Sequence, residues 1–430
     1  MRRRILATAA AVAGTALMLS ACAPSSAPKS DPDQKSGEKV TLKVWSWRTD
    51  DIAAYNKIFD VFEKKNPNIT VQFEAFQNTE YNQLLSTGLA ASDGPDIAQV
   101  RSYGQVQANI EAGQLDPLDG KVKGLDEFPE NIIASAKGKE DGKIYSVPLA
   151  TQMIQVFYNK KIFKEQGLKV PTTWDEFIAL QDKLLGDKIT PFAVGSKEDW
   201  ILPIVHDIFG SARYGGSEFE KKLLAGETDF NDPDYVASIQ LLKDLQKYFP
   251  AEVSGVGATD AQVLFASGRA AQYPGLSADI MPIRNLAPDI DMGSYPMPVA
   301  PGSVSDKPLV PSWADGNFGL NAKSKNKDAA LTLLNWMATP EFGQLVADEI
   351  HQFSAVPGVK YDDPVMKEAW AHYKDGSSPY LLLVDFRYGD PFGTAVLGTE
   401  IQKLFLGQQT AAGAATALQK GVSTWFTPGK

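Results

Sequence analysis

Cysteine, histidine and basic residues are scarce in this sequence. One cysteine in 430 residues excludes a disulfide framework and thiolate-ligated zinc or iron–sulfur sites. The three histidines, His206, His351 and His372, are too few for a histidine-rich metal centre. Lysine and arginine number 42 against 52 aspartates and glutamates, which gives a net charge of −10. That balance argues against a general nucleic-acid binder, because such proteins need a basic surface.

Long apolar runs and familiar catalytic motifs are also missing. Beyond the N-terminal segment no run of about eighteen apolar residues occurs, so no membrane-spanning helix is predicted there. The sequence contains no P-loop, no H-E-x-x-H, no G-x-S-x-G and no EF-hand loop. Gly255-Val256-Gly257 has no third glycine at the spacing of a dinucleotide site. We therefore expect no cofactor, no metal and no nucleic-acid partner.

The composition is that of an ordinary globular protein. Hydrophobic residues make up 43% of the chain and charged residues 22%. At about 100–200 residues per domain, 430 residues leave room for two domains or slightly more.

The N-terminus has the pattern of an export signal. Arg2, Arg3 and Arg4 precede an uncharged apolar run over residues 5–19. The sequence Leu19-Ser20-Ala21-Cys22 follows, and it resembles the lipobox of bacterial lipoproteins. The resemblance implies a signal peptide over 1–21, lipidation of Cys22 and a location on the outer face of the cytoplasmic membrane. The alternative is a plain secretory signal that happens to contain a cysteine.

Residues 22–39 predict a flexible tether. They contain no large apolar residue and consist mainly of serine, proline, lysine, aspartate and glycine, so they cannot bury a core. Acyl chains on Cys22 would hold the following domain at the membrane without a spanning helix.

Strands and helices alternate after residue 40. Apolar residues at every second position predict strands over 40–45 and 69–74, and a helix between them begins at Asp50 or Asp51 as N-cap. Thr173 and Glu176 form a capping box at the start of another helix. Further elements are predicted at 81–89, 96–100, 144–150, 153–158, 233–249, 259–267, 318–322, 327–337, 340–350 and in the last thirty residues. This βαβ alternation indicates an α/β fold with parallel strands.

Several motifs in order resemble one family, the carbohydrate-type extracellular solute-binding proteins of ABC importers. The series runs Gly142-Lys143-Ile144-Tyr145-Ser146-Val147-Pro148, Tyr158-Asn159-Lys160, Pro171-Thr172-Thr173-Trp174-Asp175-Glu176-Phe177, Phe265-Ala266-Ser267-Gly268-Arg269-Ala270-Ala271 and Phe318-Gly319-Leu320-Asn321, and Tyr81 to Val100 extends it upstream. Together these stretches cover nearly all of 40–426. Each motif is weak alone, and the order of all of them carries the resemblance.

The resemblance implies a two-lobed, periplasmic-binding-protein-like fold of type II. Each lobe would be a mostly parallel sheet flanked by helices. One lobe would comprise 40–149 plus 315–353 and the other 150–312 plus 357–430. Three crossings near 148–152, 311–316 and 353–358 would form the hinge, and ligand would lie between the lobes. The implied partners are an ABC permease with transmembrane subunits and a cytoplasmic ATPase, and we expect a monomer.

A sugar presents an apolar face and a rim of hydroxyls, which aromatic rings and polar side chains hold together. Residues of these types follow predicted strands or adjoin predicted crossings, where an open sheet binds ligands. The candidate binding residues are Trp47, Arg48, Arg101, Tyr103, Thr151, Gln152, Trp200, Gly275, Leu276, Trp313, Asp315, Arg387 and Tyr388. For each aromatic residue the alternative is packing in the core, which we predict for Trp174, Trp336, Trp370 and Trp425 because of their helical apolar spacing.

The function predicted from these features is capture of a carbohydrate and its delivery to a permease. Eight tryptophans favour an oligosaccharide over a monosaccharide. One alternative keeps the fold and binds a polyamine, iron or a peptide. A second is a secreted glycoside hydrolase, whose two carboxylates would come from Asp315, Asp385 and Asp390. Because relatives of the family are not catalysts, we expect no enzymatic activity.

Overall fold

The computed structural model describes residues 39–429. The predicted signal peptide 1–21, nearly all of the tether 22–39 and the lipidation site Cys22 lie outside the described residues. Within 39–429, every helix is too short or too polar to cross a bilayer.

The first sheet has the strand order β2-β1-β3-β10-β4. Its strands are β1 (Val40–Ser46), β2 (Ile69–Ala75), β3 (Ile97–Val100), β4 (Ser146–Val147) and β10 (Asn317–Leu320). β1 pairs in parallel with β2 and β3, whereas β10 runs antiparallel to both β3 and β4. In this sheet β10 is therefore the reversed strand, and it comes from a part of the chain about 170 residues further on.

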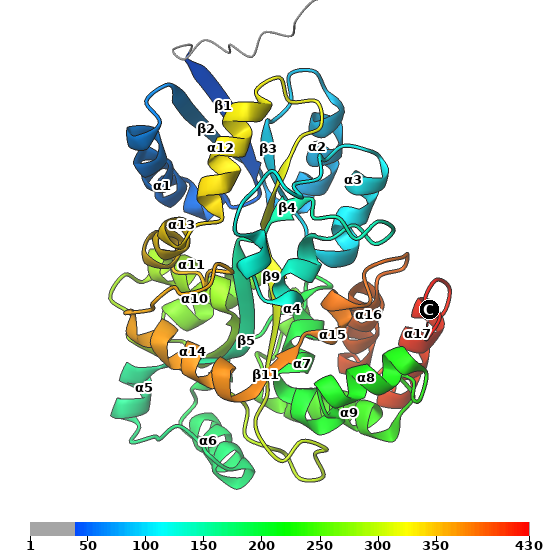
Figure 1. Cartoon of the computed structure of the whole chain (residues 1–430). Helices are drawn as coiled ribbons and strands as arrows, with labels where there is room; N and C mark the ends of the chain where they lie inside the picture. The colour runs from blue at the N-terminus through cyan, green and yellow to red at the C-terminus, as the bar shows by residue number, and fades with distance from the viewer. Residues whose placement is uncertain (1–38, 430) are drawn as a thin grey trace, which may run out of the picture. The chain divides into compact units, whose positions relative to one another are not determined.

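Alternation along β1 assigns its side chains to two separate cores. Leu42 and Val44 face α1, whose buried Tyr55 stacks on Phe73 at 4.4 Å between ring centroids. Trp47 beyond the strand end packs in the other core, with Tyr81. The helices around this sheet are α1 (Ile52–Lys65), α2 (Asn78–Ala90), α3 (Gln107–Glu111), α4 (Glu130–Ile133), α12 (Lys327–Met337) and α13 (Pro340–Leu345). Figure 1 shows that the yellow α12 lies beside the blue β1, although the two elements are far apart in the sequence.

The second sheet has the order β11-β9-β5-β7-β6, and β8 also pairs with β5. Its strands are β5 (Ala150–Asn159), β6 (Thr190–Phe192), β7 (Ala270–Leu276), β8 (Met292–Tyr295), β9 (Val310–Asp315) and β11 (Ser377–Pro379). β5 is antiparallel to β7, β8 and β9, while β6 and β11 lie parallel to their neighbours. In each sheet the described strands run in one direction except for one, so the predicted α/β class with mostly parallel sheets is confirmed.

β5 is buried along its whole length because helices cover both faces of this sheet. Ile154 and Val156 belong to the core under α7 and α16, whereas Met153 and Phe157 belong to the core under α10, α11 and α14. The helices are α5 (Lys160–Glu165), α6 (Trp174–Gly186), α7 (Ile201–Tyr214), α8 (Ser217–Ala225), α9 (Pro233–Leu245), α10 (Ala258–Ala266), α11 (Ile280–Leu286), α14 (Pro364–Gly376), α15 (Leu381–Val384), α16 (Gly393–Phe405) and α17 (Ala411–Val422).

Two predicted helix caps have different outcomes. The capping box of α6 is present: Thr173 Oγ1 accepts from the backbone amide of Glu176, and the Glu176 carboxylate accepts from the amide of Thr173. Asp51 occupies the N-cap position of α1, as predicted, but its side chain makes no capping hydrogen bond. The Asp51 carboxylate instead accepts a hydrogen bond from Arg48 Nε at 2.5 Å, since the guanidinium offers a charged donor.

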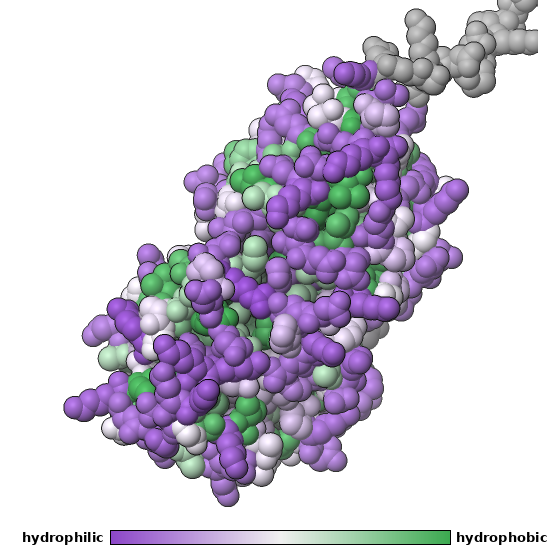
Figure 2. All heavy atoms as spheres, turned by 90° about the vertical axis from the view of Figure 1, so that its left-hand side faces the viewer, coloured by the Kyte–Doolittle hydropathy of each residue, from purple (hydrophilic) through white to green (hydrophobic). Residues whose placement is uncertain are grey.

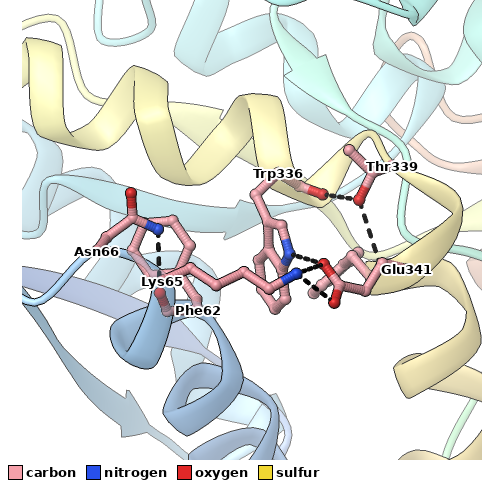
Figure 3. A network of polar contacts seen from close by, with 7 residues as sticks. Phe62, Lys65, Asn66, Trp336, Thr339 and Glu341 are labelled. Carbon is pink, nitrogen blue, oxygen red and sulfur yellow. Dashed lines mark hydrogen bonds and ion pairs between the residues drawn. The ribbon is translucent and has the colours of Figure 1, made fainter.

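The C-terminal end of α12 is fastened to α1 by a polar network (Figure 3). Glu341 accepts from Trp336 Nε1 at 2.8 Å and forms an ion pair with Lys65 at 2.5 Å. Thr339 caps α13, as the sequence predicts, by accepting from the amide of Phe342. After α13 the chain changes to a π turn over Val346–Ile350, so the helix predicted over 340–350 is regular only in its first half.

Three segments carry the chain between the two sheets. β4 leads into β5, β9 leads through Gly316 into β10, and Ser354 bridges to Ala150 beside them. Gly316 has φ = +77° and its carbonyl accepts from Gln99 Nε2 at 3.1 Å, so the turn between β9 and β10 is tied to β3. These connections bring the carboxyl ends of β1 and β3 next to β9.

The surface in Figure 2 is covered mainly by hydrophilic residues (purple), and hydrophobic residues (green) gather in patches between them. The large hydrophobic side chains that are exposed within 39–429 are scattered, and they include Leu406, Val304 and Leu286. Scattered exposure of this kind is normal for a globular protein and indicates no docking surface by itself.

Candidate functional site

A cavity of about 540 Å³, which we call the cleft cavity, lies where the two sheets meet. Its volume is in the usual range for small-molecule sites. Its walls include Trp47, Arg48, Asn78, Asn82, Arg101 and Gln105 from around the first sheet and Asp199, Trp200, Gln262, Leu276, Asp279, Tyr380, Arg387, Phe392 and Thr394 from around the second, with Trp313 and Asp315 from the crossing strand β9. Eight of the thirteen predicted binding residues therefore line this one cavity.

Trp47 and Arg101 form one wall. They follow the carboxyl ends of β1 and β3, which are parallel neighbours, and the Arg101 guanidinium carbon lies 3.9 Å from the Trp47 ring centroid. Arg101 Nη2 donates to Asn78 Oδ1 at 2.6 Å and its Nε donates to Asn82 Oδ1 at 2.9 Å. Since these two asparagines are four residues apart on α2, they lie on one face of the helix and fix the guanidinium from one side.

Arg101 is held by neutral amides, and it forms no ion pair with another side chain within residues 39–429. Burial lowers the pKa of Arg101 to about 10, and the nearby Asp315 acts in the opposite direction. The guanidinium therefore remains charged at neutral pH, and its position is fixed without a neutralising carboxylate in contact.

Asp315 and Asp279 are two partly buried carboxylates of the cavity wall. Burial raises the pKa of Asp315, and the positive charges of Arg101 and Arg48 oppose the increase. Burial also raises the pKa of Asp279, whose oxygens accept from the amide of Leu276, Tyr273 Oη and Gln262 Nε2. Asp279 is thus largely satisfied by the protein, whereas Asp315 faces the cavity with acceptor capacity for a ligand.

Three tryptophans contribute to the apolar walls. Trp313 is 5% exposed and packs against Tyr380 at 5.2 Å between ring centroids, and Trp47 is 8% exposed. Trp200, just before α7, is half-buried and lines the cavity from the side of the second sheet. A ligand in the cavity therefore meets aromatic surface from elements of both sheets.

Arg387 bridges elements of the two sheets. Its Nη1 donates to Gln105 Oε1 at 2.8 Å, in the 3₁₀ turn Tyr103–Val106 that follows β3, and its Nε donates to Thr394 Oγ1 at 3.0 Å on α16. Burial lowers the pKa of Arg387. Gly104 lies against the Arg387 backbone so closely that a Cβ would approach its carbonyl carbon to 2.4 Å. This contact explains why a glycine follows Tyr103.

A second cavity, of about 380 Å³, shares Trp313 with the cleft cavity. It is lined by three other predicted residues, Tyr103, Thr151 and Tyr388. Tyr103 Oη accepts from the backbone amide of Ala314 at 3.1 Å, so this tyrosine also ties β9 to the turn after β3.

The other two predicted residues, Gln152 and Gly275, line neither of these two cavities. Gln152 is buried in β5, where its amide accepts from Ser277 Oγ at 2.9 Å and donates to Gln352 at 3.2 Å. Gly275 lines a small hollow of about 20 Å³ beneath Trp200 and Leu276. Packing requires a glycine at this position, because a Cβ there would overlap the Tyr273 ring.

Sequence reasoning missed several residues of the cleft wall. The missed side chains are Asn78, Asn82, Gln105, Asp199, Gln262, Asp279, Tyr380, Phe392 and Thr394. A signal existed for Asn78 and Asn82, because their four-residue spacing places two amides on one helix face. The other missed residues have no such signal in the sequence, because their position in the cavity wall depends on contacts between distant segments.

Residues 39–429 contain no group of three or more histidine, cysteine, aspartate or glutamate side chains placed to hold a metal ion. The cleft cavity combines aromatic rings, guanidinium groups, carboxylates and amides, and this set can bind a polyhydroxylated molecule through its apolar faces and its hydroxyls.

Comparison with known proteins gives a consistent family assignment. Residues 45–344 match the family model described as "Bacterial extracellular solute-binding protein". The chain is 28% identical over 363 residues to the multiple sugar-binding protein of Streptococcus mutans, covering 81% of each. Its fold is similar to that of a chitin oligosaccharide binding protein (TM-score 0.75, 23% identity, 90% of this chain and 99% of that one). It is also similar to RafE in complex with raffinose (TM-score 0.72, 24% identity, 90% and 99%).

Proposed function

Because the chain belongs to the bacterial extracellular solute-binding protein family, we propose that it captures an oligosaccharide in the cleft cavity and delivers it to an ABC permease. The observation that carries this proposal is the composition of the cavity: Trp47, Trp200 and Trp313 provide aromatic surface beside charged and amide groups. The sugar ligands named for its relatives, among them raffinose and chitin oligosaccharides, support the ligand class.

The two walls of the cavity support a closing mechanism. We assign 40–149 plus 315–353 to one lobe and 150–312 plus 357–430 to the other. A ligand that contacts both lobes shifts the equilibrium towards the closed form, because it binds that form more tightly. Arg101 and Trp47 would contact the ligand from the first lobe, and Trp200 and Leu276 from the second.

The remaining parts of the proposal concern location and partners. An anchor at Cys22 would hold the protein at the outer face of the cytoplasmic membrane, and residues 22–39 would give it reach. The partner would be a permease with transmembrane subunits and a cytoplasmic ATPase, and the binding protein would act as a monomer.

Release of the sugar unaltered is favoured over hydrolysis. A glycoside hydrolase needs two carboxylates facing one bond, about 5–9.5 Å apart. Of the candidate acids, Asp315 lines the cleft cavity and Asp385 lines the second cavity. The relatives described by name are binding proteins.

Titration calorimetry tests the proposal. Raffinose, maltotriose, xylotriose and chitotriose would each be compared with their monosaccharides. At least one oligosaccharide should bind with a Kd on the order of micromolar, about −8 kcal/mol, and be recovered intact by chromatography. Tight binding of a polyamine, iron or a peptide with no heat from any saccharide would overturn the sugar assignment, and release of reducing ends would overturn binding without catalysis.

A further inference from the structure

The second cavity contains a pair of acidic side chains that the proposed function does not use. Glu220 on α8 and Asp385 directly after α15 both line it, and each of these carboxyl groups affects the pKa of the other. No lysine, arginine or histidine occurs among the described residues that line this cavity. It therefore differs from the cleft cavity, whose walls carry three arginines.

Two buried polar atoms in this cavity lack partners among the described residues. Asp385 Oδ2 has no hydrogen bond and no solvent access. Ser378, which is 4% exposed and lines the same cavity, has an unpartnered hydroxyl. Buried polar atoms are normally satisfied, so these two leave unmet hydrogen-bonding capacity in the wall of the cavity.

The surroundings of the acid pair favour its protonated form. Burial raises the pKa of Glu220, and the adjacent Asp385 raises it further; burial also raises the pKa of Asp385. The other charged groups that act on Glu220 are Lys221, which opposes the shift, and Asp207 on α7, which adds to it. Since two neighbouring carboxyl groups cannot both ionise easily, a cation placed between them would favour loss of a proton from the pair.

Aromatic rings complete the surroundings of the pair. Tyr103, Trp313, Tyr373 and Tyr388 line the cavity. The faces of aromatic rings attract cations, and a neighbouring carboxylate strengthens that attraction. Hydroxyl groups from serine and threonine side chains, Ser217, Ser312, Ser377 and Thr151, supply acceptors for the N–H bonds of an ammonium group.

From these features we infer that the second cavity binds a protonated primary amine, with Glu220 and Asp385 as its counter-ions. The amine comes either from a free alkylamine or from an amino sugar, because both present the same R–NH₃⁺ group. Binding converts the pair from one carboxyl and one carboxylate into two carboxylates, and the released proton passes to solvent. The site uses residues other than those of the cleft, apart from Trp313, so its test is separate from that of sugar capture.

Calorimetry with 1,4-diaminobutane and with glucosamine separates the two sources. The matched neutral probes are 1,4-butanediol and N-acetylglucosamine, which should give no heat. At pH 7, titration in phosphate and in MOPS should show release of up to one proton per amine bound, because the two buffers differ in ionisation enthalpy. Binding of either amine supports the site and identifies its source; binding of neither amine overturns it, as does binding without proton release.

Variants test the location of the site. Glu220→Gln and Asp385→Asn should each weaken amine binding at least tenfold and abolish proton release. Glu218→Gln is the control, since it makes the same change on α8 at an exposed glutamate that pairs with Lys221 outside the cavity. Glu220→Gln keeps an amide donor beside Asp385 and should melt near the wild-type temperature. Equal amine affinity in the wild type, Glu220→Gln and Asp385→Asn would contradict the inference.

Discussion

At the scale of single residues, the tryptophans of the cleft cavity differ in how much they contribute to the stability of the fold. Trp47 and Trp313 are nearly buried, so truncating either one leaves a void that costs about 3–5 kcal/mol of stability. Trp200 is half-buried and lines the cavity, which makes it the cleaner probe. We predict that Trp200→Ala weakens oligosaccharide binding about tenfold to a hundredfold, because an aromatic face contributes about 1.5–3 kcal/mol, and calorimetry measures the change.

The control for this change is Trp174→Ala. Trp174 is also half-buried, and it lines a separate surface groove on α6 together with Leu241 and Tyr248. Its truncation should lower stability and leave sugar affinity unchanged. A loss of affinity in both variants would assign the effect to general destabilisation, and unchanged affinity in Trp200→Ala would remove Trp200 from the site.

At the scale of elements, the turn between β9 and β10 depends on one glycine. Gly316 has φ = +77°, and a Cβ there would lie 2.5 Å from Gln99 Nε2. Gly358 has φ = +82° and nothing within 4 Å of such a Cβ. We therefore predict that Gly358→Ala costs about 1–2 kcal/mol of unfolding free energy, from backbone strain alone, and that Gly316→Ala costs more because it also displaces Gln99.

Urea unfolding of both variants measures the difference. Ser46 Oγ donates to the same Gln99 side chain, so its displacement disturbs β1 and β3 together with the turn. Gly316→Ala should also weaken sugar binding, since Trp313 and Asp315 immediately precede the turn. Equal stabilities of the two variants would show that the Gln99 contact contributes nothing.

At the scale of the whole molecule, capture between two lobes requires a change of size. We predict that a binding oligosaccharide lowers the radius of gyration of the protein in small-angle scattering, because contacts to both walls favour the closed form. A saccharide that gives no heat in calorimetry serves as the control. Heat of binding without compaction would contradict closure while leaving the site itself intact.

Much of the element pattern is predictable from the sequence. The strand over 40–45, the capping box at Thr173, the N-cap Thr339 and the helix over 327–337 are confirmed because each depends on residues within one turn or one strand. The prediction that Trp336 packs in the core is also confirmed, since it is 9% exposed. Asp51 lies at the predicted N-cap of α1, but its carboxylate pairs with the Arg48 guanidinium three residues before it and not with a backbone amide of the helix.

Hydrophobic periodicity, capping and turn chemistry act over a few neighbouring residues, so the α/β class, the family resemblance and most elements follow from the order of amino acids alone. Which side chains share a cavity depends on the folded arrangement of distant segments. Gln99 reaches Gly316 across 217 positions, and Arg387 reaches Gln105 across 282. Contacts at such separations are set by how the sheets and crossings pack. Asp385 and Glu220 therefore line one cavity although no local sequence pattern predicts it.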